Sequence, residues 1–136
     1  MTEVMHAGGC QCGAIRYEAS GDPVVVAMCH CSMCRRANAA PAVAWAMFSE
    51  AQVRFVASKP KNYASSASAY RGFCCDCGTQ ISFTADYIPG LIDLTVGSFD
   101  CPEWLPPSLH YWETKRLPWV QFADTLPRHA EFPSLE

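Results

Sequence analysis

The sequence predicts a mainly β protein with few short helices, and three observations lead to that prediction. Apolar and polar residues alternate with a period of two, as Ile15 and Tyr17 do against Arg16 and Glu18, which is typical of half-buried strands. Glycine and proline interrupt such segments at short intervals, and no long stretch repeats at the 3.6-residue helical period. The 136 residues, 50% hydrophobic and 17% charged, suffice for one core. We therefore expect a single domain over residues 1–136.

The expected elements are short and follow one another closely. A polar lead over residues 1–7 comes first, and runs of β-branched or alternating apolar residues then predict strands separated by Gly and Pro turns. Residues 37–40 predict a short helical turn, which Pro41 ends. Residues 59–62 and 65–68 interrupt the strand pattern. The expected strands are residues 14–19, 24–28, 43–48, 53–56, 81–83 and 91–96.

Charge and hydropathy exclude several classes of protein. Ten basic and 13 acidic residues give a net charge of −3, which argues against a nucleic-acid-binding face. The longest apolar-rich run, residues 39–48, contains a proline and is about half the length of a membrane span. Residues 1–9 lack the basic and apolar regions of a secretory signal. We therefore expect a cytoplasmic protein that binds neither nucleic acid nor membrane.

Nine cysteines in 136 residues are far more than usual, and they point to metal rather than to disulfides. An odd number fits a fully paired framework poorly, and the thiols of a cytoplasmic protein stay reduced. The cysteines are also grouped at the short spacings that metal sites use.

Four cysteines, here called the quartet, predict a structural zinc site. Cys10 and Cys12 form a C-x-C arm, and Cys74 and Cys77 form a C-x-x-C-G arm some sixty residues later. Four thiolates saturate a tetrahedral zinc and leave no open position. A C-x-C arm formed by Cys75 and Cys77 would also reach the zinc ion, although C-x-x-C-G is the commoner zinc-binding motif. The competing interpretation is a set of buried free thiols that pack as small hydrophobes.

Three further cysteines, here called the triplet, predict a catalytic zinc site. Cys29, Cys31 and Cys34 lie within six residues and could grip one ion from a single short loop. Three protein ligands leave the fourth position free, which is the arrangement of catalytic zinc. One alternative is a metal-free redox pair. The other is a second structural site completed by a distant ligand, for which the candidates are His30, Cys101 and His110.

Arg35 and Arg36 follow the triplet directly and are the candidate substrate-binding residues. Positive charge beside thiolates lowers thiol pKa values and compensates an anionic metal–sulfur centre. The guanidinium groups could also bind the carboxylates of a substrate. The alternative is that both are ordinary surface arginines. Tyr70 and Arg71, just before the second quartet arm, could line a cleft between the two sites, with ordinary packing as the alternative.

Together these motifs resemble the glutathione-dependent formaldehyde-activating enzyme family. The resemblance rests on G-C-x-C-G-x-[IV]-R-Y at residues 9–17, C-x-C-x-x-C-R-R at 29–36, F-C-x-x-C-G-T at 73–79 and V-G-S-F-D-x-P at 96–102. His110, Lys115 and Trp119 also look like the C-terminal pattern of the family. The match runs from about residue 8 to residue 127, and the cysteine spacings are its specific part.

The resemblance implies a β-tent-like fold of mostly antiparallel strands, with a structural zinc on the quartet and a weakly held second zinc on the triplet. It implies a carbon–sulfur lyase-type enzyme that promotes adduct formation between glutathione and formaldehyde. Cys75 and Cys101 depart from the family pattern. Either could compete for zinc or fill the open position of the triplet.

The function that we expect is addition of a small thiol, such as glutathione, to formaldehyde or another small aldehyde, or the reverse release. The second zinc would bind the thiol sulfur, and Arg35 or Arg36 would bind a carboxylate. The proton of the new hydroxyl would come from His30 or from water. The alternatives are a non-catalytic zinc module that binds a protein partner and a thiol-based redox sensor or zinc reservoir.

Overall fold

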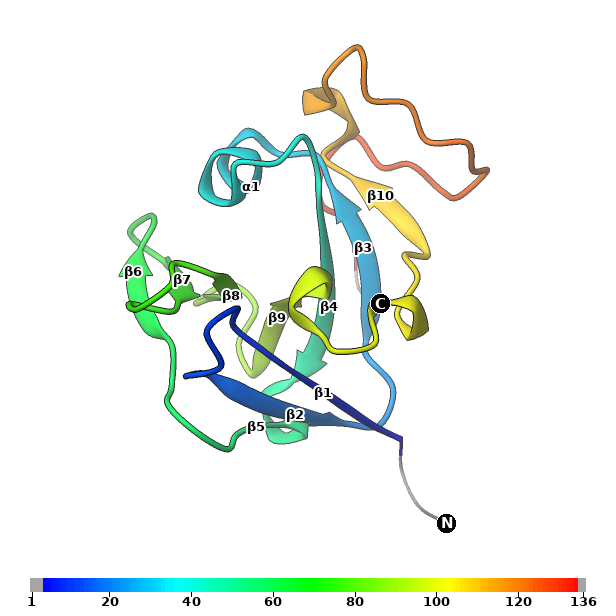
Figure 1. Cartoon of the computed structure of the whole chain (residues 1–136). Helices are drawn as coiled ribbons and strands as arrows, with labels where there is room; N and C mark the ends of the chain where they lie inside the picture. The colour runs from blue at the N-terminus through cyan, green and yellow to red at the C-terminus, as the bar shows by residue number, and fades with distance from the viewer. Residues whose placement is uncertain (1–3, 135–136) are drawn as a thin grey trace.

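In the computed structural model, which describes residues 4–134, the chain is mainly β, as the sequence predicts (Figure 1). The described part has ten strands, one α-helix and four short 3-10 helices. The strands are β1 (Met5–Gly9), β2 (Arg16–Ser20), β3 (Val25–Cys29), β4 (Val43–Ser49), β5 (Val53–Phe55), β6 (Lys61–Ala64), β7 (Ala69–Phe73), β8 (Gln80–Ala85), β9 (Leu91–Thr95) and β10 (Leu109–Tyr111). The helices are α1 (Ser32–Asn38), η1 (Glu50–Gln52), η2 (Val96–Ser98), η3 (Pro102–Trp104) and η4 (Glu113–Lys115).

The strands form two sheets. A three-stranded antiparallel sheet has the order β1-β2-β5, and a seven-stranded sheet has the order β10-β3-β4-β9-β8-β7-β6. Within the large sheet, only the β10–β3 pair of the described strands is parallel. The mostly antiparallel arrangement fits the short hairpin turns of the sequence. In Figure 1 the small sheet crosses in front of the large one, and α1 follows β3 at the far end.

Several boundaries differ from those that the sequence predicts. The expected polar lead over residues 1–7 overlaps β1, because Met5–Gly9 pairs along the whole of β2. The helix starts at Ser32 rather than at residue 37, and it ends where Ala39 adopts a left-handed conformation with φ of 49°, before Pro41. Lys61–Ala64 forms the edge strand β6, although every side chain in it is exposed and gives no apolar signal.

The main core lies between the two sheets. Alternate residues of β2 face inward, so Tyr17 is fully buried, and it packs against Phe99 with ring centroids 5.1 Å apart. The Tyr17 hydroxyl hydrogen-bonds with the Ser98 hydroxyl at 2.6 Å, which pairs its one polar group inside the core. A Cβ atom at Gly8 would collide with the Tyr17 ring and the Ser98 carbonyl oxygen, so glycine is required for this approach of β1.

Within residues 4–134, no helix has the length and apolar character needed to cross a membrane.

Candidate functional site

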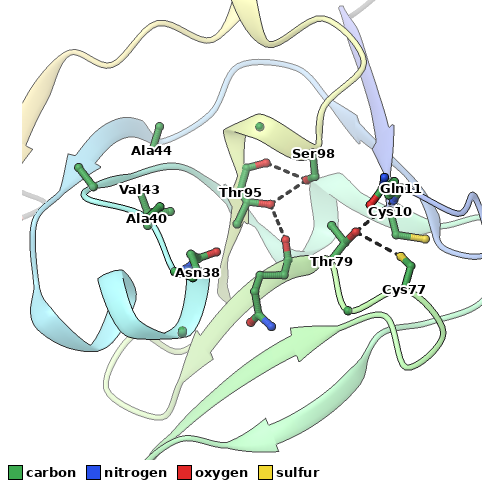
Figure 2. A pocket seen from close by; sticks show the side chains of 17 residues that line it. Cys10, Gln11, Asn38, Ala40, Val43, Ala44, Cys77, Thr79, Thr95 and Ser98 are labelled. Carbon is green, nitrogen blue, oxygen red and sulfur yellow. Dashed lines mark hydrogen bonds between the residues drawn. The ribbon is translucent and has the colours of Figure 1, made fainter.

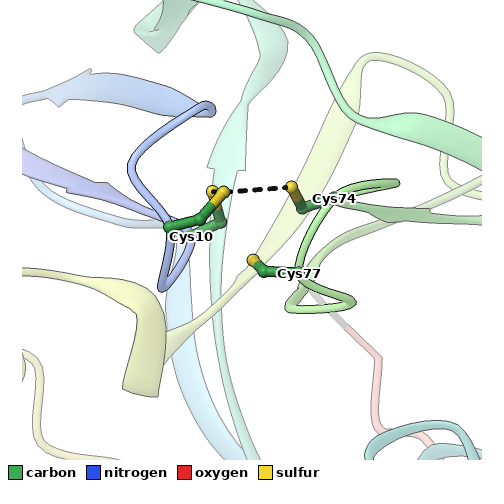
Figure 3. Close-up of side chains that lie close together, drawn as sticks. Cys10, Cys74 and Cys77 are labelled. Carbon is green, nitrogen blue, oxygen red and sulfur yellow. Dashed lines mark hydrogen bonds between the residues drawn. The ribbon is translucent and has the colours of Figure 1, made fainter.

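The quartet joins two hairpin turns that belong to different sheets. Cys10 and Cys12 lie in the turn between β1 and β2, and Cys74 and Cys77 lie in the turn between β7 and β8. The two arms face each other across a small gap (Figure 3). Gly13 and Gly78 follow the two arms with φ of 85° and 81°, the left-handed conformation that lets each loop fold back.

The spacing of the quartet sulfurs fits a tetrahedral metal. The Cys10 and Cys12 Sγ atoms are 3.6 Å apart, and the Cys12 and Cys74 Sγ atoms are 3.8 Å apart. A zinc–sulfur bond of about 2.3 Å gives a tetrahedron with edges of about 3.8 Å. A disulfide would need about 2.05 Å, and the described cysteines are all free thiols. The donor set therefore fits zinc and does not fit a disulfide framework.

Hydrogen bonds favour the thiolate form at two of the quartet cysteines, Cys10 and Cys77. The Ile15 N–H donates to the Cys10 Sγ at 3.2 Å. Hydrogen bonds from the Thr79 hydroxyl and then the Thr79 N–H lower the pKa of the Cys77 thiol to about 5. The Gly78 N–H, in contrast, donates to the Cys74 carbonyl oxygen at 2.8 Å rather than to sulfur. Thiolate is the form that binds a metal ion.

Cys75 lies outside the quartet. Its side chain is exposed, and its Sγ lies 3.9 Å from the Asp76 carboxylate, whereas the ligand atoms of Cys74 and the other three quartet members all lie within 4.8 Å of one another. This geometry favours Cys74 over Cys75 as the first cysteine of the second arm.

Two consecutive elements, β3 and α1, position the triplet. Cys29 ends β3, Cys31 caps the N-terminus of α1, and Cys34 lies within that helix. The triplet is therefore not a single loop, because α1 already includes its third cysteine. The three Sγ atoms all lie within 4.8 Å of one another, and the Cys34 N–H donates to the Cys31 Sγ at 3.2 Å. The first turn of α1 therefore places the Cys34 thiol close to the thiols of Cys29 and Cys31.

A buried arginine supplies positive charge to the triplet. Arg71 on β7 is 6% exposed, and its two terminal nitrogens lie 3.7 and 3.6 Å from the Cys34 Sγ. Hydrogen bonds from the Cys29 and Cys34 thiols, with the Cys34 N–H and the Arg71 charge, hold the pKa of the Cys31 thiol well below its usual value. The sequence predicts that Arg35 and Arg36 compensate the negative charge of the triplet. In the structure, Arg71 on β7 is the cation in contact with a triplet sulfur.

Within the described chain, no fourth His, Cys, Asp or Glu side chain joins the triplet. Cys101 is exposed at the start of η3, and His110 points toward another group of residues. The alternative of a site closed by one of these distant ligands is therefore not supported by the geometry.

The triplet lines a pocket of about 440 Å³. Its walls come from α1, from the face of β7, β8 and β9, and from the C-terminal segment. The charged and phenolic groups in the wall are those of Arg71, Tyr87, Asp93, Tyr111 and Lys115, and Ser32, Ser65 and Ser66 add hydroxyl groups. The apolar part of the wall is formed mainly by Trp45, Phe83, Ile88, Tyr111, Trp112 and Phe132. A thiol-lined, largely apolar pocket of this size can enclose a small ligand.

The predicted substrate-binding residues Arg35 and Arg36 lie on α1 beside the triplet, but neither lines this pocket. Their role in binding a carboxylate stays a prediction. Sequence reasoning missed Asp93 as a pocket residue. One signal could have found it, because Asp93 is a charged residue inside the apolar strand β9, on the opposite face from Ile92 and Leu94.

His30 and His110 are buried together, away from the triplet pocket. The Asp124 carboxylate lies 3.0 Å from the His110 Nε2, so that nitrogen donates to it and the His110 Nδ1 is left to accept from the His30 Nε2, 3.0 Å away. Burial lowers the pKa of His30, which agrees with a neutral ring. The Glu113 Oε2 atom lies 3.4 Å from the His30 Nε2 atom. These contacts fasten the C-terminal segment to β3.

A second, larger cavity of about 770 Å³ lies between the quartet and α1. Figure 2 shows the Thr79 hydroxyl at its edge, between the Gln11 backbone and the Cys77 sulfur. Small side chains such as Ala40 and Ala44 line the opposite side. It contains no member of the triplet.

Known proteins resemble this chain in sequence or in fold. The pattern of the family described as glutathione-dependent formaldehyde-activating enzyme matches residues 5–115. An uncharacterized lyase of Schizosaccharomyces pombe is 35% identical over 78 residues, which are 57% of this chain and 56% of that protein. A crystal structure of a Rhodobacter sphaeroides protein aligns with a TM-score of 0.52 at 20% identity and covers 90% of this chain and 98% of the other.

The structural likeness, at that identity, concerns the fold alone. The family match is different in kind, because it covers most of the chain and includes the quartet and the triplet. The chain therefore belongs to the glutathione-dependent formaldehyde-activating enzyme family.

Proposed function

We propose that this protein is a zinc-dependent carbon–sulfur lyase-type enzyme that forms or cleaves the adduct between glutathione, or a similar thiol, and formaldehyde or another small aldehyde. The observation that carries the proposal is the triplet itself. Three thiols with no fourth protein ligand in the described chain line an enclosed pocket, whereas the quartet brings together four thiols, the number that saturates a tetrahedral zinc. Family membership supports the same substrates.

The residues at both sites fit zinc, and we assign Cys10, Cys12, Cys74 and Cys77 to a structural ion and the triplet to a catalytic one. A zinc ion bound by the triplet would supply Lewis-acid chemistry that keeps the thiol of a substrate ionised near neutral pH.

The chain itself contributes positioning and desolvation. The aromatic wall of the pocket excludes water from the reacting groups, which strengthens the electrostatic interactions inside it. Holding a thiol and an aldehyde together in one pocket replaces a bimolecular encounter by a preorganised contact. Lys115 at the rim is exposed and could bind a carboxylate of glutathione, the role predicted for Arg35 and Arg36.

The rival proposals of a closed structural site and of a redox sensor make different predictions for thiol binding. We expect glutathione to change the sulfur-to-cobalt absorption of the cobalt-substituted protein, because the ion at the triplet has a free position. The quartet contributes a constant background. The glutathione analogue with alanine in place of cysteine is the matched ligand control and should cause no change.

The variant Cys31→Ser should keep the quartet spectrum and lose the response to glutathione. An unchanged wild-type spectrum at saturating glutathione would exclude the catalytic proposal in favour of a closed site. Release of one ion with formation of a disulfide in the triplet under mild oxidant would favour the sensor.

Replacing Arg71 with methionine should weaken metal binding at the triplet by about 10- to 100-fold, the range found when a supporting residue around a metal is lost. The physical reason is the loss of the only buried cation in contact with the Cys34 sulfur among the described residues. Competition for zinc with a chromophoric chelator measures the effect. Arg36→Met is the matched control on the exposed side of α1, and equal affinities in the two variants would contradict the assignment.

A further inference from the structure

Adduct formation moves a proton as well as making a carbon–sulfur bond. The thiol loses its proton when it becomes the nucleophile, and the aldehyde oxygen gains one when it becomes a hydroxyl. Catalysis therefore benefits from a side chain in the pocket that can both accept and donate near neutral pH. His30, one of the two proton sources that the sequence predicts, does not line the pocket, and its Nε2 is engaged with His110.

Asp93 lies in the wall of that pocket. The strand pairing aligns Arg71 on β7 with Phe83 on β8, and Phe83 with Asp93 on β9. Paired residues of antiparallel strands project to the same face of a sheet, so the three side chains form one row facing the triplet. All three line the pocket, and Asp93 is only 5% exposed.

Among residues 4–134, the carboxyl group of Asp93 has no hydrogen-bond or salt-bridge partner, and burial alone accounts for its shifted pKa. Asp124 and Glu113, for comparison, each contact a histidine and Arg128. A buried carboxyl without partners favours its neutral form, and burial raises the pKa of Asp93 to about 7. Such a group can exchange a proton at neutral pH.

The surrounding charged and titratable groups do not compete for this role. Burial raises the pKa values of Tyr87 and Tyr111, so both phenols stay protonated. Arg71 contacts the Cys34 sulfur and the Phe83 ring, and Lys115 lies exposed at the rim. Three thiolates around a divalent ion would leave one net negative charge, which Arg71 offsets, so the triplet does not favour ionisation of Asp93.

We propose that Asp93 is the general acid–base residue of this reaction, an inference that rests on the proposed function. The ionised carboxylate takes the proton that the thiol releases. The thiolate sulfur then attacks the aldehyde carbon, the carbon–sulfur bond forms, and the π electrons of the C=O bond move to oxygen. Asp93 donates its proton to that oxygen and gives the S-hydroxymethyl product. The reverse sequence, with the same proton moving back, releases thiol and aldehyde.

The test compares Asp93→Asn with Asp22→Asn, an exposed aspartate outside the pocket. Exchange NMR with isotope-labelled formaldehyde measures the rate of adduct formation above the uncatalysed background over a range of pH. We expect Asp93→Asn to lower kcat by about 100-fold or more and to remove the titration near pH 7. The KM for glutathione and the cobalt response to glutathione should stay as in the wild type.

Asp93→Glu keeps a carboxyl and should recover part of the rate, which separates loss of chemistry from loss of folding. Full activity with an unchanged pH profile in Asp93→Asn would overturn the assignment and leave the proposed function standing. A raised KM for glutathione with kcat unchanged would also overturn it, because Asp93 would then bind the ammonium group of the substrate. A wild-type protein that neither accelerates exchange nor responds to glutathione would overturn both proposals.

Discussion

Replacing Cys74 with serine is expected to leave a chain that no longer unfolds cooperatively. A structural zinc contributes about 10–16 kcal/mol in small zinc domains, whereas whole domains are stable by about 5–15 kcal/mol. Cys74 is 2% exposed and lies within the main core cluster. The quartet also ties the turn of the small sheet to the turn of the large one. Circular dichroism during heating and the zinc content per chain measure the effect.

Cys75→Ser is the matched control, because it makes the same chemical change one residue away. Its side chain is exposed and outside the quartet, so this variant should unfold at the wild-type temperature with the wild-type zinc content. The reverse result, with Cys75→Ser losing zinc and Cys74→Ser keeping it, would mean that the second arm begins at Cys75.

The cysteine pattern could be interpreted from the sequence because a metal site imposes fixed spacings on its ligands. The C-x-C and C-x-x-C-G arms predict that two distant turns meet, and the turns of Cys10 and Cys74 do meet. Alternation in residues 14–19 likewise predicts a strand with one buried face, and Tyr17 and Ala19 are fully buried on β2. In both cases the signal is local, so no knowledge of the tertiary structure is needed.

The pocket could be predicted only in part, through the suggestion that Arg71 lines a cleft, because strand register decides which side chains face it. Arg71 reaches the triplet because of the register of β7, β8 and β9, which places Arg71, Phe83 and Asp93 in one row. The sequence instead favoured Arg35 and Arg36, which are adjacent in the chain but outside the pocket lining. Proximity to the triplet in the sequence does not tell which way a side chain points, because successive residues of a helix point to different sides.

The helix boundary was missed for a related reason. Cys31 accepts a hydrogen bond from the Cys34 N–H at the start of α1, in the position where serine or aspartate is usual. Because cysteine is not a usual helix-start residue, the sequence predicts the short helix only after Arg36. The consequence concerns function, because the helix turn gathers the three thiols.

Replacing Asp93 with asparagine is expected to stabilise the protein, increasingly so as the pH rises. The pKa of Asp93 is about 7 in the folded protein and 3.8 is its usual value, so the folded state binds this proton more tightly than the unfolded state. The stability that the protonated Asp93 carboxyl group contributes is complete below about pH 4 and is lost as the pH rises through 7. At pH 8 the burial of the ionised carboxylate costs on the order of 4 kcal/mol, a cost that asparagine does not carry.

Urea unfolding of the zinc-loaded wild type and of Asp93→Asn at a series of pH values measures this difference. The gap in the free energy of unfolding should grow between about pH 4 and pH 7 and then stay constant, while Asp22→Asn should show no such trend because Asp22 is exposed. A gap that does not change with pH would mean that Asp93 is ionised throughout. Loss of stability at working pH is a common cost of a functional site, so a stabilised variant with lost activity is the combination that the two proposals jointly require.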